Sequence, residues 1–545
     1  MPSPPLSQPS SDPRVWLGVL AYPTFAVIWA TSSLALIGLA MYDTASGWLM
    51  TQLDLDPLDV SLLHAAVNLP MFLFTLPAGA IADIVNPRRT IIAVSAGVAG
   101  LIAIFASLVS FDLASPALLL LTTFLLSAAW SLSSPAWLSI LPSLVPKSDL
   151  SGAIAANGVA YNVSRTVGPA LGGFIIMNFG VSTPFWAFVA ANLGVIAALL
   201  WWRGACKETA ALPAERLNSA VRTGIRHAAH NRLLRATLVR AVAVYPFAAA
   251  YWGLLPLIAR RTGHGAEHFG LFLSMVSAGA VVGSISQRRL RARIDLDRMV
   301  VLGTVATAGA LWVFSATQQF IFVLGACFCA GVGWVVILTG LYVSAENALP
   351  EWVRGRGLAI FLTVIFGTMT VCSAAWGEIA GQVGLSEALL LSAAGIVIAM
   401  PLSWRWKLQQ SEALDLSPSL HWAPPKSVAE IADDRGPILV KIEYRIDLKD
   451  RAKFLRALDE LGEERRRHGA FAWGVFEDMS EFGRFEEGYL IESWLELKHV
   501  RERVTVEDRA LEDEISEMLL KPPRIEFLVA SERRARARPH AAAGA

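Results

Sequence analysis

The chain has 545 residues, of which 54% are hydrophobic and 17% charged, and its mean hydropathy is +0.49. Soluble globular proteins carry about 25% charged residues, and disordered chains are far less apolar, so both classes are excluded. The 46 basic and 45 acidic residues leave a net charge of +1, which argues against a nucleic-acid partner. The four cysteines form no C-x-x-C pair, so neither a metal site nor another cofactor is expected. The composition therefore indicates a membrane protein.

The N-terminal residues 1–14 form a Pro- and Ser-rich tail that lacks the pattern of a signal peptide, and we expect it to be disordered. After this tail come twelve mostly apolar segments, each long enough to cross a hydrocarbon core, which takes about 20 residues. These segments are 24–51, 58–82, 90–110, 115–142, 150–177, 182–202, 236–259, 267–288, 297–317, 319–346, 357–380 and 386–405. They predict an all-α membrane region of about twelve transmembrane helices.

Basic residues fall in alternate loops between these segments. One set of loops contains Arg88, Arg89, Lys147, seven basic residues from 203 to 235, five from 288 to 298, and Arg354 with Arg356. The opposite loops are mainly acidic, and Arg260 and Arg261 are their only basic residues. Positively charged loops stay on the cytoplasmic side of a membrane. Both termini are therefore predicted to be cytoplasmic, in a multi-pass protein of the plasma or inner membrane.

The membrane region also repeats internally. Gly-Ala-Ile-Ala at 79–82 corresponds to Gly-Ala-Val-Val at 279–282, and an Arg-Arg pair follows each stretch. This repeat predicts two six-helix halves, 15–205 and 236–406, joined by a basic central loop at 206–235. Two such halves around a central site are the architecture of a secondary transporter. A channel needs no such halves, and no Walker-type sequence is present for an ATP-driven pump.

A second, water-soluble domain is predicted at the C-terminus, because 51 of the acidic and basic residues lie after residue 406. Residues 407–436 are polar and contain several prolines, as is typical of a linker. Residues 437–530 follow the order strand, helix, strand, strand, helix, strand, which predicts an α+β ferredoxin-like cytoplasmic domain. The expected strands are 438–446, 471–476, 489–495 and 524–529, and the expected helices are 450–468 and 506–520. The basic tail 531–545 is expected to be disordered or to contact anionic lipid.

Two motifs in the membrane region resemble those of a known family. Residues 79–89, Gly-Ala-Ile-Ala-Asp-Ile-Val-Asn-Pro-Arg-Arg, resemble the loop signature G-x-L-A-D-r-x-G-r-[RK] of the major facilitator superfamily, with departures at Ile84, Asn86 and Pro87. Residues 168–173, Gly-Pro-Ala-Leu-Gly-Gly, resemble the G-P-x-x-G-G element of exporters in that superfamily. Over residues 15–406 the chain resembles the enterobactin-exporter-like, transmembrane secretion effector branch. This resemblance implies the major facilitator fold and efflux of a siderophore, drug or metabolite.

The soluble domain resembles the dimeric monooxygenase-like domains of antibiotic biosynthesis, with Glu492-Ser493-Trp494 followed by 504–509. The resemblance implies dimerisation through this domain, regulation, or catalysis. The sequence contains no catalytic constellation that can be named there. We therefore interpret the domain as a regulatory or assembly module, and the whole chain as a transporter and not an enzyme.

The loop motif contains a carboxylate, Asp83, which can pair with Arg88 or Arg89 at the cytoplasmic end of the second segment. Such an ion pair can hold one conformation and break as the halves rock, although a plain topology anchor is the alternative. A second pair, Glu346 with an arginine just after it, would mirror this contact in the other half. The predicted gating motif comprises Gly79, Asp83, Arg88, Arg89, Glu346, Arg354 and Arg356.

The exporter element combines close packing with a bend. Gly168, Gly172 and Gly173 let neighbouring helices approach closely, as small residues do in membranes. Pro169 removes one backbone donor and favours a bend. Both a moving contact and static packing are consistent with this pattern.

Ionisable residues inside a membrane are expensive and are therefore functional candidates. Asp43 in the first segment is a candidate proton carrier, unless it is merely solvated near the outer mouth. Arg165 in the fifth segment is a candidate cavity charge, which either pairs with an acid such as Asp43 or binds an anionic substrate.

Asn68, Asn157 and Asn162 either line the cavity or form hydrogen bonds between helices. A lone His64 is more typical of packing, and Trp29, Trp130, Trp137, Trp252, Trp334 and Trp376 form either a pocket wall or an interfacial belt.

These observations predict a bilayer-embedded secondary transporter that exports a small amphipathic molecule, with H⁺ as the coupling ion. An importer or facilitator of the same fold is one alternative. A membrane-tethered monooxygenase-like enzyme is the other.

Overall fold

The computed structural model describes residues 18–82, 86–202, 228–263, 265–409 and 435–530, and the single positions 226, 417, 419 and 432. It divides into two units. The first comprises residues 1–217, 238–342 and 361–407, and the second comprises residues 218–237, 343–360 and 408–545. The second unit therefore contains the C-terminal sheet together with the ends of three long helices.

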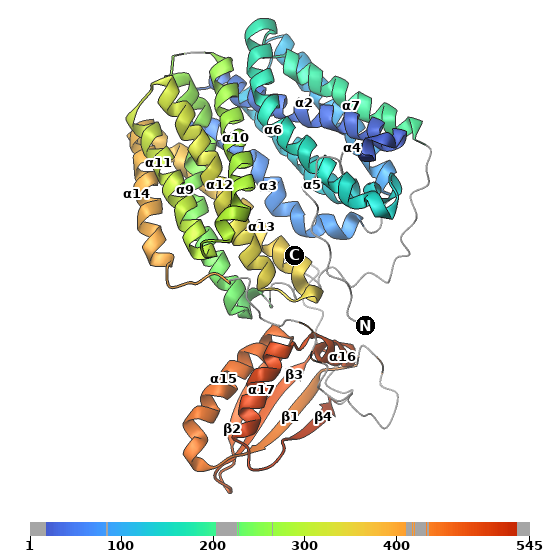
Figure 1. Cartoon of the computed structure of the whole chain (residues 1–545), viewed down its shortest axis with the longest axis vertical. Coiled ribbons are helices and arrows are strands. Elements are labelled where there is room, and N and C mark those ends of the chain that lie inside the picture. The colour runs from blue at the N-terminus through green and yellow to red at the C-terminus, as the bar shows by residue number, and fades with distance from the viewer. Residues whose placement is uncertain are drawn as a thin grey trace, which may run out of the picture. The chain divides into compact units, whose positions relative to one another are not determined.

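Within the described ranges, twelve long helices coincide with the twelve predicted segments (Figure 1). They are α2 (Pro23–Leu53), α3 (Pro57–Ala82), α4 (Pro87–Ser110), α5 (Pro116–Ile140), α6 (Leu150–Phe179), α7 (Thr183–Trp201), α9 (Arg232–Arg261), α10 (Ala266–Arg291), α11 (Leu296–Ala316), α12 (Phe320–Asn347), α13 (Glu351–Val383) and α14 (Leu385–Ser403). Among the described residues, eleven of these helices are long and apolar enough to span a membrane, and α6 is not among the eleven. The polar side chains of α6, which include Asn157, Asn162 and Arg165, lower its hydropathy.

The helix ends follow from local sequence. Proline occupies the first position of α2, α3, α4 and α5, where the missing N–H would have no intrahelical partner. The Asn86 side chain accepts a hydrogen bond from the Arg89 backbone and caps α4, and Ser115 caps α5 in the same way. Gly180 ends α6 and Gly384 separates α13 from α14, both with positive φ.

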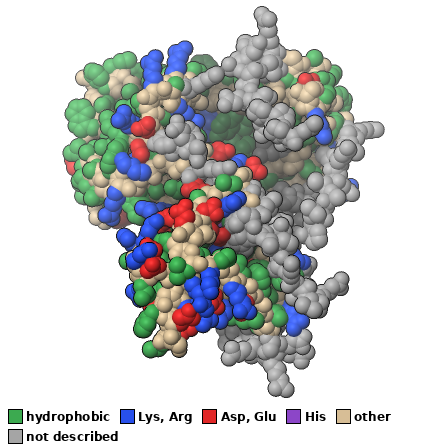
Figure 2. All heavy atoms as spheres, turned by 60° about the horizontal axis from the view of Figure 1, so that its bottom comes forward, with side chains coloured by type: hydrophobic (Ala, Val, Ile, Leu, Met, Phe, Trp, Pro, Cys, Tyr) green, Lys and Arg blue, Asp and Glu red, His purple; other side chains and the backbone are tan. Residues whose placement is uncertain are grey.

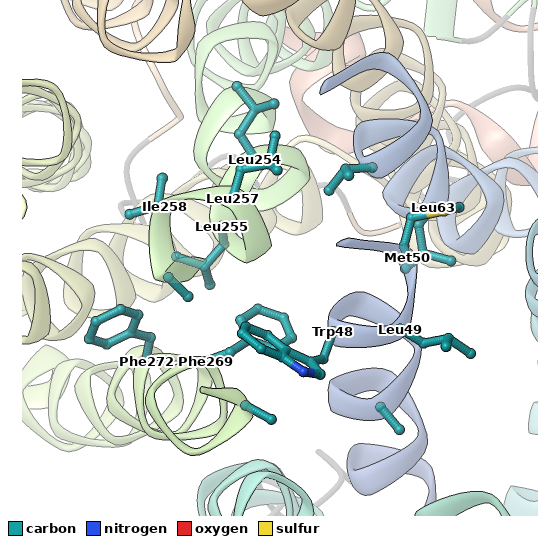
Figure 3. Packing of buried hydrophobic residues seen from close by; sticks show 14 of the residues in the cluster. Trp48, Leu49, Met50, Leu63, Leu254, Leu255, Leu257, Ile258, Phe269 and Phe272 are labelled. Carbon is teal, nitrogen blue, oxygen red and sulfur yellow. The ribbon is translucent and has the colours of Figure 1, made fainter. Parts of the chain in front are cut away.

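The first unit is held together by apolar and aromatic packing. In its N-terminal half α2 packs against α6 and α7, α3 against α5, and α4 against α7. Tyr42, Phe105 and Phe185 form an edge-to-face aromatic cluster with centroid distances of 5.3–5.4 Å. Figure 3 shows Trp48 of α2 beside Phe269 of α10, in a cluster that also contains Leu254 of α9. This cluster joins the two halves.

One ion pair lies buried inside the C-terminal half. Arg240 of α9 donates from Nη2 to Oδ1 of Asp297 of α11 at 2.6 Å, and from Nη1 to the Ser403 hydroxyl of α14 at 3.3 Å. Only 2% of the Arg240 side chain is exposed. The ion pair and the hydrogen bond to Ser403 therefore connect α9, α11 and α14.

The second unit contains a four-stranded antiparallel sheet in the order β2-β3-β1-β4. Its elements are β1 (Ile438–Arg445), α15 (Arg451–Arg467), β2 (Phe471–Glu477), β3 (Arg484–Ile491), α16 (Trp494–Arg503), α17 (Val506–Glu517) and β4 (Arg524–Val529). This order is consistent with a ferredoxin-like domain. Alternate β1 residues are buried, and they belong to a core that includes Phe454 and Leu458 of α15 and Ile515 of α17. Figure 2 shows acidic and basic side chains crowded together on the surface of this part of the chain.

The third strand differs from the prediction. It runs from Arg484 to Ile491, not from 489 to 495, and the short helix α16 occupies the last part of the predicted strand. The observed strand includes Glu487, a charged residue that the predicted strand left out. The structure buries Glu487 completely, and its carboxylate accepts hydrogen bonds from the Tyr444 hydroxyl at 2.7 Å and the Trp473 indole at 2.9 Å.

Replacing one partner of the buried ion pair tests its role in the fold. Arg240→Met leaves the Asp297 carboxylate buried without its partner, and such a loss costs about 3–5 kcal/mol. We expect a clearly lower thermal unfolding temperature in detergent. The double variant Arg240→Met/Asp297→Leu removes both charges and should recover most of the loss. Equal loss in the single and double variants would show that the ion pair is not the cause.

A pH test addresses the second unit. Burial, followed by the charge of Asp508, raises the pKa of the Glu464 carboxyl to about 8. Between about pH 4.5 and pH 8 the folded domain keeps a proton on Glu464 that the unfolded chain releases. Glu464 therefore makes the free energy of unfolding fall as the pH rises through this range. Above about pH 8 it causes no further loss. Urea unfolding of the sheet, measured at several pH values, should show this slope reduced in Glu464→Gln. The exposed neighbour gives the control, because Glu463→Gln should keep the slope.

Candidate functional site

A cavity of about 470 Å³ lies inside the N-terminal half of the first unit, between α2, α4, α5, α6 and α7. Three indole side chains, Trp29, Trp130 and Trp137, stand in its wall. Apolar side chains from all five helices complete most of the lining, including Phe25, Leu36, Val98, Leu126 and Phe188. None of the described lining residues is acidic or basic, and Tyr161 is the one titratable side chain among them. The cavity is therefore a largely apolar, aromatic chamber.

The two predicted intramembrane charges lie at one end of this cavity. Asp43 is four residues after the lining residue Leu39 on α2, and Arg165 is four residues after the lining residue Tyr161 on α6. Residues four apart share a helix face, so both charges lie one turn beyond the lining. Their charges interact through space, although the structure describes no direct ion pair between them.

Tyr161 connects the cavity to these charges. The Arg165 guanidinium donates from Nη1 to the Tyr161 hydroxyl at 3.0 Å and lies 5.7 Å from the centroid of the same ring. One residue thus contributes its ring to the cavity wall and its hydroxyl to the charged group. No sequence pattern indicates this role, since a tyrosine on an apolar helix commonly packs in the core.

The predicted exporter element forms a close contact between the two halves. A Cβ added at Gly173 would lie 2.6 Å from the carbonyl oxygen of Ala266 in α10, and one added at Gly172 would lie 3.2 Å from Met41 Cα in α2. The Ala170 N–H donates to the Ser274 hydroxyl of α10 at 2.9 Å. Only glycine permits this approach of α6 to α10.

Other contacts join the halves near the same end. His64 of α3 shares a hydrogen bond of 2.8 Å with the Ser373 hydroxyl of α13, and its ring stacks on Trp252 of α9. The Arg260 guanidinium of α9 donates to the backbone carbonyl of Thr51 in the last turn of α2. The halves therefore meet where α2 and α6 end, whereas the cavity lies where these helices begin. Sequence reasoning missed these contacts, because a lone histidine and a loop arginine carry no pattern that names a distant partner.

The predicted asparagines lie in different places. Asn157 lines the cavity. Asn162 is not among the lining residues, and its amide donates to the Gly158 carbonyl on its own helix. Asn68 is also outside the lining, and it donates to the carbonyl of His64.

The residues of the predicted gating motif are less completely described. Asp83 lies outside the described residues. Gly79 falls within α3, Arg88 donates from Nε to the Leu199 carbonyl at 2.9 Å, and Arg89 is exposed. The other three residues belong to the second unit, where they are half-buried at the end of α12 and the start of α13: Glu346, Arg354 and Arg356.

The polar groups inside the soluble domain bond mainly to one another. The Arg465 guanidinium lies 2.7 Å from Glu512 and 3.5 Å from Glu487, whose carboxylate also accepts from Tyr444 and Trp473. His468 lies 3.0 Å from Asp508, and burial lowers the histidine pKa. Within the described residues no cluster of three or more His, Cys, Asp or Glu side chains is arranged to hold a metal ion.

Comparisons with known proteins agree with a transporter. A family model described as "Transmembrane secretion effector" matches residues 16–535. The multidrug efflux pump Tap of Mycobacterium tuberculosis (strain ATCC 25618 / H37Rv) is 24% identical over 409 residues, which cover 73% of this chain and 96% of that protein. The uncharacterized MFS-type transporter YfiS of Bacillus subtilis (strain 168) is 25% identical, covering 62% and 82%.

Solved structures share the fold at low sequence identity. The nucleoside transporter NupG superposes with a TM-score of 0.54 at 10% identity, covering 70% of this chain and 98% of that one. A bacterial homologue of the lysosomal transporter Spinster gives a TM-score of 0.54 at 14% identity, covering 73% and 98%. These likenesses concern the fold of the helical region.

The glycine contact can be tested with an accessibility reporter. A valine at position 173 collides with the Ala266 carbonyl, and overpacking of this kind costs about 1–3 kcal/mol. We expect Gly173→Val to loosen α6 from α10. The reporter is a cysteine in place of the buried Ser274, in a chain whose four native cysteines are replaced by alanine. In Gly173→Val this cysteine should react with a water-soluble maleimide at least about five-fold faster than in the parent chain that keeps Gly173.

The control for this test is Gly97→Val on α4, where an added Cβ meets nothing within 4 Å. Its labelling rate should equal that of the parent chain. Equal rates in all three proteins would contradict the assignment of α6 and α10 as a tight contact.

Proposed function

The chain belongs to the transmembrane secretion effector family of major facilitator transporters, and we propose that it exports a small amphipathic molecule from the bacterial cytoplasm by alternating access. The observation that carries this proposal is the aromatic cavity in the N-terminal half, with Asp43 and Arg165 one turn beyond its lining. A family relative named as a multidrug efflux pump supports export over import. Substrate would occupy the cavity from the side where α2 and α6 begin, which the loop charges assign to the cytoplasm.

Asp43 is the proton carrier in this proposal. A carboxylate at membrane depth is costly as an anion and gains stability by taking up a proton or by interacting with a cation. Arg165 supplies the cation. Exchange of a proton at Asp43 in each cycle would change the charge at the end of the cavity and so link substrate movement to the proton gradient.

The glycine contact is the moving joint in this proposal. Gly168, Pro169, Gly172 and Gly173 hold α6 against its neighbours at the end where the halves meet, and this contact would separate when the transporter opens there. The predicted ion pairs at the opposite end would close the cytoplasmic side in that state. They are Asp83 with Arg88 or Arg89, and Glu346 with Arg354 or Arg356.

We assign the soluble domain to regulation or assembly, including dimerisation. Contacts inside the second unit support this role, because the Arg503 guanidinium lies 4.5 Å from the ring of Trp352 in the first turn of α13. The domain is thus linked to a helix that continues into the first unit. Many of its buried polar groups pair with one another, as Arg465 does with Glu512, which favours this assignment over the alternative of a tethered monooxygenase-like enzyme.

Proton flux in proteoliposomes tests the proposed function. Under an imposed pH gradient, a panel of siderophores and drugs should contain a compound that drives proton movement in the wild type. Asp43→Asn, which cannot release a proton at this position, should abolish that movement while leaving the protein folded. Asp59→Asn, at the first turn of α3, is the matched control and should keep it.

The outcomes separate the parts of the proposal. Equal flux in the wild type and Asp43→Asn would retain a transporter but remove Asp43 as the proton carrier. Substrate accumulation inside expressing cells, in place of extrusion, would contradict export. Substrate movement without any proton movement would contradict antiport.

A further inference from the structure

Most hydroxyl and amide groups in the cavity wall are already hydrogen-bonded to their own helices. The Ser32 and Ser33 hydroxyls donate to the carbonyls of Ile28 and Trp29 at 2.6 and 2.7 Å. Ser133 and Ser134 donate in the same way to carbonyls three residues back. Asn192 donates to the Phe188 carbonyl at 2.9 Å. A wall whose polar groups are satisfied in this way presents a nearly apolar surface to a ligand.

Asn157 departs from this arrangement. On the same helix, the amides of Asn162 and Asn178 donate to the carbonyls four residues before them, each at 2.8 Å. Asn157 forms no such bond, nor any other bond to a described residue, and it is half-buried in the wall. Its amide offers both a donor and an acceptor. Ser95 and the indole N–H groups of Trp29, Trp130 and Trp137 also have no described bond, but the Ser95 side chain and the Trp29 indole nitrogen are buried.

The charges near the cavity are engaged outside it. Arg165 donates to the Tyr161 hydroxyl and interacts with the charge of Asp43, one turn beyond the lining. An anionic ligand placed among the indoles would lose its hydration without meeting a positive charge, which is costly. The wall therefore disfavours a ligand that carries a negative charge into the chamber, and the described lining contains no carboxylate to pair with a cation.

We propose that the cavity binds an uncharged aromatic molecule whose single hydrogen-bonding group faces Asn157. Flat rings stack well between Trp29, Trp130 and Trp137, and a volume of about 470 Å³ lies in the range of cavities that hold drug-sized ligands. This inference rests on the proposed function only in treating the bound molecule as the transported one. In this proposal Asn157 selects among apolar ligands by its hydrogen bond. Arg165 takes part in coupling and does not bind an anionic substrate.

Two probes with one ring system test the charge preference. N-phenyl-1-naphthylamine is uncharged, and 8-anilino-1-naphthalenesulfonate adds a sulfonate to the same skeleton; both fluoresce in apolar surroundings. The full chain is reconstituted in nanodiscs, with protein-free nanodiscs as the blank. We expect saturable binding of the uncharged probe, at least ten-fold tighter than that of the sulfonate. Equal or tighter binding of the sulfonate, or no saturable binding of the uncharged probe, would overturn the proposal.

A substitution tests Asn157 with the same probe. Asn157→Leu keeps the side-chain size and removes the hydrogen bond to the probe's N–H, so the affinity should fall about three- to ten-fold. Binding of 1-phenylnaphthalene, which has no N–H, should not change. Asn178→Leu, the same substitution on the same helix outside the cavity, should leave both affinities unaltered. Equal losses for the two probes would contradict the role of Asn157.

Binding and transport can fail separately. The nanodisc measurement uses no pH gradient, so saturable binding of the uncharged probe stands even if no compound drives proton flux. Proton flux driven by a charged compound, combined with no binding of the uncharged probe, would leave the transporter intact and refute the cavity's preference.

Discussion

The hydrocarbon core of a bilayer offers no water to a polar group, and this constraint governs the whole helical region. Every polar side chain there must find a partner within the protein or remain a costly exception. Arg240 finds Asp297 and Ser403, Trp376 donates to the Pro246 carbonyl, and most of the cavity serines bond to their own helices. Other polar groups have no described hydrogen-bond partner and lie in both halves, as the Trp29 indole and the Tyr245 hydroxyl do. Asp43 and Arg165 share no direct ion pair, Asn157 has no described partner, and all three lie in or next to one cavity.

The same constraint explains the contrast between the two ends of the N-terminal half. Where α2 and α6 end, the halves meet through glycine, backbone and hydroxyl contacts that leave little room for a ligand. Where these helices begin, bulky indoles stand apart and leave a chamber. A tight joint at one end and a cavity at the other suit a molecule that rocks about its centre. Tyr161 and Arg165 lie between them, next to Asp43, the proposed proton carrier.

The helical fold was largely predictable because a membrane helix satisfies its backbone internally, so length and hydropathy locate it. The fold of the C-terminal domain was less predictable than the helical region. The strand that contains Glu487 buries this carboxylate through hydrogen bonds from Tyr444 and Trp473, which lie elsewhere in the sequence. For the candidate site, the cost of a charge in lipid selects Asp43 and Arg165 as candidates, and both lie one turn beyond the cavity lining. No such rule distinguishes Asn157 from Asn162, since they differ only in where their amides point in the folded chain. Pairings such as His64 with Ser373 need three-dimensional information, because periodicity shows which face a residue occupies and not its partner.

A cryo-EM structure of the full chain in nanodiscs, with a transported compound bound, is the most direct test of the proposed cavity. We expect ligand density among Trp29, Trp130 and Asn157, inside the N-terminal half, with Arg165 still bonded to Tyr161. Density confined to the C-terminal half, or density that pairs the ligand with Arg165 and leaves the cavity empty, would contradict it.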